Sequence, residues 1–226
     1  MPRAQPHSGD RGTRDRILRH GRQIVARAGL RGLTVRKLAA RARVNLGTFV
    51  YHFGTRDAFI TELMESWYAP LYTRLKLTAD EQLAPLARLH RFLLQFAAFL
   101  VDNRQLVRNL ILDAFDGERA ALRFIRSLAA RHPALLFELI RQAQQAGELP
   151  AGDPLQAGIF LAGATVLPSI WIGILLPKDF IPAPMRPVVQ QLAVAPEQIE
   201  KRFDWALEGV AARRAQRPAL GKGKLA

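Results

Sequence analysis

The sequence predicts an all-α protein. Apolar residues recur at helical spacing through most of the 226 residues, and almost no segment alternates as a strand does. With an apolar fraction of 49% the chain can bury a substantial core, and it contains no cysteine. That absence excludes a disulfide framework, a thiol nucleophile and any cysteine-based metal site. We expect a cytoplasmic protein, because the first residues contain no apolar run that would serve as a secretory signal.

The positive charge is concentrated near the N-terminus. The chain carries a net charge of +14, and residues 1–60 hold 13 basic side chains against 3 acidic ones. A basic region of this kind is typical of proteins that bind polyanions, because neutralised phosphates release their counterions. Charge alone leaves open the alternative of a solvated basic face that has no partner.

Three short helices are expected in this basic region. Thr13 can cap a first helix that Gly29 ends. Thr34 can cap a second helix, which extends to about residue 40, and Asn45 can cap a third, which extends to about residue 51. A short helix, a tight turn and a second short helix form the helix-turn-helix arrangement.

Longer helices are expected in the rest of the chain. A helix from Thr55 to about Leu77 contains Pro70, which should kink or break it. Further helices are expected over residues 85–101, 104–113, 118–130, 133–147, 154–176 and 196–214. Residues 177–196 should form a proline-rich connector, and residues 216–226 a flexible tail.

The segment Thr34–Phe53, TVRKLAARARVNLGTFVYHF, resembles the DNA-binding domain of the TetR family of transcriptional regulators. The shared pattern is a Thr-capped helix, a turn that closes on Val-Asn, and a Gly-Thr-aromatic stretch that ends in His-Phe. The resemblance extends over residues 13–68. It implies an N-terminal three-helix DNA-binding domain, with the helix-turn-helix at about 34–53, and a helical ligand-binding and dimerisation domain over residues 69–215.

Two positions depart from the family pattern. Arg43 stands in the turn where the family usually has glycine, so a left-handed backbone there would be unfavourable. Val50 stands where the family usually has tyrosine, and Tyr51 comes one place later. A shift of one residue rotates a helical side chain by ~100°, so the groove wall that Tyr51 faces stays open.

These residues together predict a DNA-binding surface. A recognition helix must enter the ~12 Å major groove, and small residues keep its outer face slim. Helix N-terminal caps can also hold a phosphate, although such caps are preferred in any helical protein. The predicted DNA-binding residues are Thr34, Arg36, Asn45, Leu46, Gly47, Thr48, Tyr51, His52 and Arg56.

Residues 1–12 are expected to form a flexible basic arm. Arg3 and Arg11, with Arg14 just beyond, either reach into a minor groove or belong to a tail that contacts nothing.

The segment Leu155–Leu176 contains 22 residues without a charge and is long enough to span a bilayer. Polar residues and a central Pro168 within it favour a helix buried between two subunits, and we expect no stable membrane insertion. The predicted interface would form a four-helix bundle across a two-fold axis. Its predicted residues are Gly158, Ala162, Ile199, Phe203 and Leu207.

Aromatic residues in the second part of the chain suggest an apolar ligand pocket. The candidate ligand-binding residues are Phe96, Phe99, Phe115, Phe137 and Trp171. Aromatic stripes at this spacing also occur as ordinary core. Asp113, Asp116 and Glu118 form an acidic cluster, which is either a site for a cationic effector or a solvated loop.

The sequence contains no pattern typical of catalysis, of a metal site or of a bound cofactor. The function that the sequence favours is a homodimeric regulator, a repressor that binds palindromic double-stranded DNA and is released by a small apolar or amphipathic ligand. One alternative is a helix-turn-helix regulator that responds to a protein partner or to nothing. A second is a membrane-associated basic protein anchored by residues 155–176.

Overall fold

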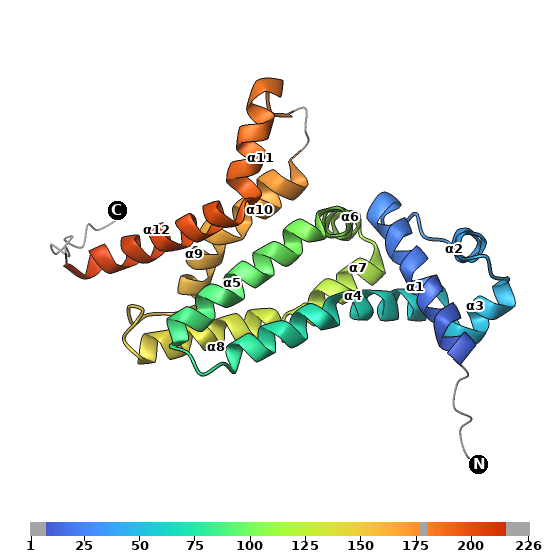
Figure 1. Cartoon of the computed structure of the whole chain (residues 1–226), viewed down its shortest axis with the longest axis horizontal. Coiled ribbons are helices and arrows are strands. Elements are labelled where there is room, and N and C mark those ends of the chain that lie inside the picture. Colours follow the sequence, from blue (N-terminus) through green and yellow to red (C-terminus); the bar gives the residue numbers. More distant parts are fainter. Residues whose placement is uncertain (1–7, 177–179, 216–226) are drawn as a thin grey trace, which may run out of the picture. The chain divides into compact units, whose positions relative to one another are not determined.

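The computed structural model describes residues 8–176 and 180–215, and every regular element among them is helical (Figure 1). The chain forms two compact units: unit 1 combines Met1–Tyr72 with Asn103–Ala129, and unit 2 combines Thr73–Asp102 with Ala130–Ala226. In chain order the elements are α1 (Ser8–Ala28), α2 (Val35–Ala42), α3 (Leu46–Phe53), α4 (Arg56–Ala79), α5 (Pro85–Asp102), α6 (Arg104–Phe115), α7 (Arg119–Leu128), α8 (His132–Gln145), α9 (Pro154–Thr165), α10 (Leu167–Ile170), the π-helix η1 (Trp171–Leu175), the 3-10 helix η3 (Ala183–Met185), α11 (Arg186–Val194) and α12 (Pro196–Ala215).

Unit 1 is built around the apolar face of α1. This helix packs against α2 and α6, and α3 lies beside α2 (Figure 1). The Phe49 ring of α3 is buried and lies 5.5 Å from the Phe53 ring and 5.6 Å from the Phe59 ring of α4. A helix as short as α3 is marginal on its own, so this aromatic cluster stabilises it through tertiary packing.

Helix α6 contributes two polar side chains that satisfy the end of α1. The Asn109 amide donates hydrogen bonds to the carbonyls of Val25 and Ala26, each at 2.9 Å. The Asp113 carboxylate is only 6% exposed and accepts a hydrogen bond from the Leu30 amide at 2.6 Å. The last carbonyls of any helix lack intrahelical partners, so α6 supplies groups that α1 and the turn after it need.

Unit 2 packs α5, α8, α9 and α12 around an apolar core. Helix α5 lies against α8, and α12 lies against both α9 and α5. Helices α8 and α9 approach closely at Gly158, where an added Cβ would lie 2.8 Å from the Phe137 ring. The His90 ring of α5 lies 4.7 Å from the ring of Phe203 on α12.

The single helix predicted over residues 154–176 is divided in the structure. Helix α9 ends at Thr165, α10 follows with four residues, and residues 171–175 form a π-helix. Pro168 explains the division because it has no amide hydrogen to donate to the carbonyl of Ala164. The guanidinium of Arg202 on α12 replaces that donor, with Nε 3.0 Å from the Ala164 oxygen. No described helix is both long enough and apolar enough to cross a membrane.

The predicted connector over residues 177–196 contains a helix, α11, which the proline content concealed. Its C-terminal end is fixed by side chains: Ser169 Oγ donates to the Ala193 carbonyl at 2.7 Å, and Arg202 Nη1 donates to the Leu192 carbonyl at 2.5 Å. Burial lowers the pKa of Arg202. A single guanidinium thus holds the ends of both α9 and α11.

Two other helix boundaries differ from the prediction. Helix α1 begins at Ser8, so Thr13 lies inside the helix and does not cap it. Residues 8–12 of the predicted flexible arm are therefore helical, whereas residues 1–7 and the predicted tail, 216–226, lie outside the described residues. Helix α4 continues through Pro70 to Ala79 without ending. The helices predicted between residues 85 and 147 match α5 to α8 within two residues at each end.

Candidate nucleic-acid interface

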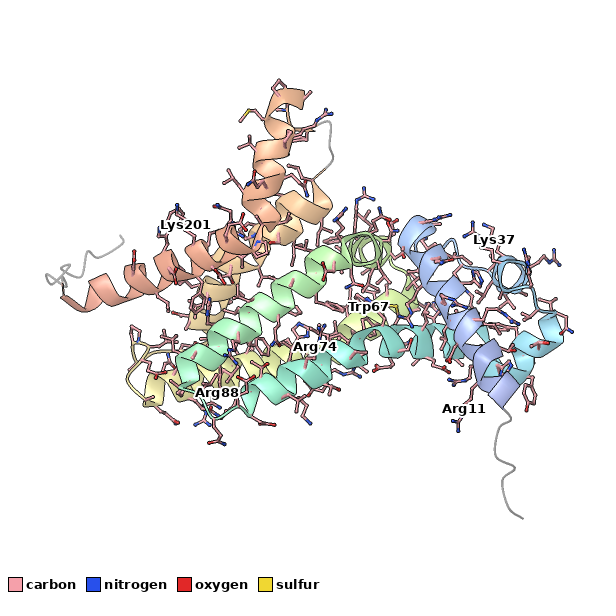
Figure 2. The ribbon with its side chains drawn as sticks, viewed as in Figure 1. Arg11, Lys37, Trp67, Arg74, Arg88 and Lys201 are labelled. Carbon is pink, nitrogen blue, oxygen red and sulfur yellow. The ribbon has the colours of Figure 1, made fainter. Side chains whose placement is uncertain are left out.

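Helix α2 is capped as the sequence predicts. Thr34 has an extended backbone, and its Oγ1 accepts a hydrogen bond from the Lys37 amide at 3.2 Å. The buried side of the helix carries Leu38. Its outer side carries Arg36, Lys37 (labelled in Figure 2) and Arg41, all exposed. This short helix therefore presents Arg36 and Lys37 in its first turn, where the helix dipole also favours anions, and Arg41 in its last turn.

The turn between α2 and α3 has the left-handed backbone that the family pattern suggests. Arg43 has φ 52° and ψ 50°, and it is exposed. Its amide donates to the Ala40 carbonyl, and the Val44 amide donates to the Ala39 carbonyl. This pair of hydrogen bonds defines a Schellman motif, in which glycine is the usual left-handed residue. For an L-amino acid, the left-handed conformation is higher in free energy than the right-handed helical one by about 1–2 kcal/mol.

Helix α3 is capped by Asn45, again as predicted. Asn45 Oδ1 accepts from the Thr48 amide at 2.7 Å and from the Thr48 hydroxyl at 3.0 Å. A Cβ on Gly47 would lie 3.3 Å from the same Oδ1, so a larger residue there would crowd the cap. Gly47 therefore serves the cap and keeps the outer face of the helix slim.

The exposed face of α3 combines apolar and aromatic side chains. Leu46 is 49% exposed, Val50 56% and Tyr51 76%. Val50 was not among the predicted DNA-binding residues, although its place one turn after Leu46 on an amphipathic helix could have identified it. Tyr51 lies edge-on to the His52 ring, 5.1 Å away. The outer face thus offers methyl groups and a phenol, both of which can contact base edges or phosphates.

Arg56 lies apart from this exposed face. Its Nε donates to the Leu33 carbonyl at 2.9 Å, and its Nη2 donates to the Leu30 carbonyl at 2.6 Å. The side chain is about one-third exposed and also lies 3.8 Å from Glu118. The structure therefore places Arg56 at the turn between α1 and α2, where it satisfies backbone oxygens. The other eight predicted DNA-binding residues lie on α2, on α3 or at their caps.

Of the three arginines considered for the N-terminal arm, two are in the described part of the chain. Arg3 lies outside it, and Arg11 is exposed in the first turns of α1. Arg14 forms an ion pair with Glu62 at 2.6 Å and lies over the Phe53 ring, 5.4 Å from its centre. Burial raises the pKa of Glu62 even though Arg14 opposes that shift. Arg14 thus joins α1 to α4 inside unit 1.

The five candidate ligand-binding aromatics are distributed over both units. Phe115 is in unit 1 and is 80% exposed, whereas the other four are in unit 2. Phe96 stacks on His132 with ring centres 4.5 Å apart, and burial lowers the pKa of His132 to about 4. Phe99 is buried and Phe137 packs against α9, while Trp171 is 57% exposed. Most of this aromatic set is ordinary core or surface.

The three acidic side chains of the cluster make contacts within the chain, although Asp116 is exposed. Asp113 is buried against Leu30, and Asp116 pairs with Arg31 at 2.7 Å. Glu118 accepts a hydrogen bond from the Ala120 amide and caps α7. Two of these contacts attach residues 113–118 to the turn after α1, in the part of unit 1 formed by residues 8–68 and here called the head. Among the described residues no group of three His, Asp or Glu side chains is placed to hold a metal ion.

Three of the five predicted interface residues are covered by their own chain. Gly158 lies against Phe137, and Ile199 and Phe203 are buried in the core of unit 2. Ala162 and Leu207 are partly exposed. The sequence could not show which side of an apolar helix faces outward. The side chains that are exposed on α9, α10 and η1 are Leu155, Ile159, Phe160, Leu167 and Trp171, here called the apolar face of unit 2.

Two comparisons with known proteins found similarity, one to the N-terminal region of the sequence and one to the fold of the chain. Residues 17–63 match the sequence profile of the family described as bacterial regulatory proteins, tetR family. No curated protein matches the chain. The profile match covers α2, α3 and all three rings of the aromatic cluster that supports α3.

Solved structures resemble nearly the whole chain. A proposed transcriptional regulator from Pseudomonas aeruginosa PAO1 is 21% identical with a TM-score of 0.69, and the match covers 95% of this chain and 97% of that one. A proposed TetR-family regulator from Mesorhizobium loti is 15% identical with a TM-score of 0.61, over 91% and 98% of the two chains. A TetR-like regulator from Rhodococcus sp. RHA1 is 16% identical with a TM-score of 0.55, over 94% and 98%. At these identities the likeness concerns the fold.

Proposed function

Because the head of this chain belongs to the TetR family of bacterial regulatory proteins, we propose that the protein is a repressor that binds a palindromic operator as a homodimer. Members of this family are transcription factors and not enzymes, as the sequence predicts. The observation that carries the proposal is the exposed face of α3, together with the capped N-termini of α2 and α3 and the exposed basic side chains of α2.

In this proposal α3 enters the major groove. Gly47 and Thr48 let the helix approach the bases, and Tyr51 and Val50 extend from its outer face. Val50 is suited to contact a thymine methyl group. The amides at the N-termini of α2 and α3, with Arg36 beside them, are suited to hold phosphates on either side of the groove.

A homodimer is supported by the apolar face of unit 2. Its members include Ile159, 65% exposed, and Phe160, 50% exposed. Exposed apolar side chains gathered on neighbouring elements are typical of an interface. Residues 154–194 carry only three charges, Lys178, Asp179 and Arg186, in a chain with a net charge of +14. Because two such chains repel each other, a nearly uncharged surface is the one suited to self-association.

We also propose that a small apolar or amphipathic ligand releases the DNA. Two heads that read a palindrome must stand about one DNA turn apart, ~34–36 Å, or a multiple of it. A ligand that binds better to a dimer with another head spacing lowers the DNA affinity by its differential affinity for the two arrangements. The alternative is a regulator that responds to a protein partner or to nothing, and thermal-shift measurements with hydrophobic compounds distinguish the two.

The proposal is tested by fluorescence anisotropy of the purified protein on labelled DNA from its own upstream region, with a scrambled duplex as control. We expect tight binding of two subunits per site to the upstream duplex, with a steep loss of affinity as salt rises. Equal and weak binding to both duplexes would contradict a role as a specific regulator of that region.

A further inference from the structure

Three helices of this chain end in the same backbone motif, and one of them differs from the other two. Helices α6 and α8 end in Schellman motifs with Gly117 at φ 80° and Gly147 at φ 74° in the left-handed position. Helix α2 ends in that motif with Arg43 at φ 52°. Among the described residues Arg43 is the one non-glycine residue with positive φ. Elsewhere in the described ranges, 8–176 and 180–215, a positive φ is taken by glycine.

Packing within the chain does not account for the arginine. Its side chain is exposed, and within the described part of the chain no hydrogen bond or ion pair holds it. The motif itself needs only the amides of Arg43 and Val44, and glycine would supply the first of these without strain. A strained backbone that brings no internal contact points to a contact with another molecule.

The position of Arg43 indicates the chemistry of that contact. It lies two residues before Asn45, which caps α3, and it follows the exposed cations Lys37 and Arg41 of α2. A guanidinium binds a phosphate through paired hydrogen bonds, and a helix N-terminus favours the same anion. We propose that Arg43 binds a phosphodiester of the DNA backbone beside the N-terminus of α3. This role rests on the proposed function, because it requires DNA against α2 and α3.

The contact has a measurable electrostatic signature. One phosphate neutralised per head contributes about 0.9 to the slope of log affinity against log salt, or about 1.8 for a dimer. At 0.15 M salt this corresponds to about fivefold in affinity per head and about thirtyfold for two heads. Because the contact is to the backbone, its loss should weaken specific and scrambled duplexes to a similar extent.

The experiment uses the full chain with Arg43→Gly, Arg43→Asn and Arg43→Lys, and measures thermal unfolding together with anisotropy on the operator duplex over a salt series. Arg43→Gly and Arg43→Asn should raise the midpoint of unfolding, because both residues accept the left-handed conformation. The same two variants should lower the affinity by about thirtyfold and the salt slope by about 1.8. Arg43→Lys should keep the salt slope of the natural protein.

A matched control removes one positive charge elsewhere. Arg74 is exposed on α4 in unit 2 (labelled in Figure 2), and Arg74→Ala should leave both affinity and slope unchanged. If Arg43→Gly binds DNA as tightly as the natural protein and with the same salt slope, the proposal that Arg43 contacts a phosphate is wrong. A loss of both stability and affinity in Arg43→Gly would instead make Arg43 a structural residue of the turn. Failure of the natural protein to prefer the operator would contradict the proposed function itself.

Discussion

The short helices α2 and α3 of unit 1 and the helices α9 and α11 of unit 2 are satisfied at their ends in different ways. In unit 1 each short helix is capped by a neighbour in sequence, as with Thr34 and Asn45, and α6 adds Asn109 and Asp113 at the end of α1. In unit 2 one side chain, Arg202, donates to carbonyls of both α9 and α11. Local caps thus fix the starts of α2 and α3 in unit 1, whereas in unit 2 the ends of α9 and α11 share one donor from α12.

The outer surfaces of the two units also differ, in the charge and the polarity of their exposed side chains. The head of unit 1 exposes cations around α2 and α3, and unit 2 exposes apolar side chains on α9, α10 and η1. A cationic surface favours a polyanion, and an uncharged apolar one favours another protein surface. Because the two surfaces differ, separate mutations should be able to weaken the proposed DNA binding and the proposed dimerisation independently.

The largest expected effect concerns the apolar face of unit 2. Ile159→Arg should weaken the proposed dimer by about 3 kcal/mol, roughly a hundredfold in the dissociation constant, because it buries a cation in an uncharged interface of a basic protein. The fold of the subunit should be unaffected, since Ile159 is 65% exposed. Sedimentation at several dilutions measures the change. Leu77→Arg, at a side chain 64% exposed on α4, is the control and should leave the dimer intact.

A smaller effect is expected where α6 meets α1. Asp113→Ala should lower the free energy of unfolding by about 2–3 kcal/mol, because it leaves the buried Leu30 amide without an acceptor. Asp116→Ala removes an exposed ion pair and should lower the free energy of unfolding by less than about 1 kcal/mol. Urea denaturation compares the two. Equal losses would show that burial of the Asp113 carboxylate does not distinguish this contact from a surface pair.

In unit 2 the corresponding test is Arg202→Ala. Loss of the guanidinium should lower the free energy of unfolding by about 1–2 kcal/mol, because carbonyl groups at the ends of α9 and α11 lose their hydrogen-bond donor. Hydrogen exchange should then become faster in α11, whose end is tied to that side chain, than in α5. Unchanged exchange in α11 would mean that Ser169 alone holds it.

The smallest effect is a pH dependence from His132. Burial lowers its pKa from the usual 6.5 of histidine to about 4, so between these pH values the unfolded chain binds a proton that the folded chain does not. Stability should therefore decrease as pH falls, by about 1 kcal/mol between pH 7.5 and 5.5 from this residue. His132→Phe keeps the stack on Phe96 and should remove that part of the slope. An identical slope in the variant would exclude His132 as its source.

The sequence was most informative where structure is local. The caps at Thr34 and Asn45, the left-handed turn at Arg43 and the helices between residues 85 and 147 all depend on residues close together in the chain. The partners of Asp113 and Arg56 are 83 and 23–26 residues away, so spacing could not reveal them. Arg56 therefore looked like a DNA contact, and Asp113 like part of an exposed loop.

The exposed side of unit 2 was hidden for a related reason. Leu155–Leu176 is apolar on every side, so its periodicity could not distinguish Gly158, which is buried, from Ile159, which is exposed. A break at Pro168 could be expected from the sequence. The side chain that donates to the unpaired Ala164 carbonyl, Arg202, lies 38 residues after Ala164 and could not be identified from spacing. Helix α11 follows prolines that are typical of connectors.

The most direct test of the central proposal compares two exposed aromatic side chains of unit 1. Tyr51 on α3 is 76% exposed and Phe115 on α6 is 80% exposed, so neither is needed for the core. On the operator duplex, at fixed salt, Tyr51→Ala should bind about tenfold more weakly than the natural protein, because it removes a contact from each recognition helix. Phe115→Ala should bind with unchanged affinity. Equal affinities for the natural protein and Tyr51→Ala would contradict the placement of this face of α3 against DNA.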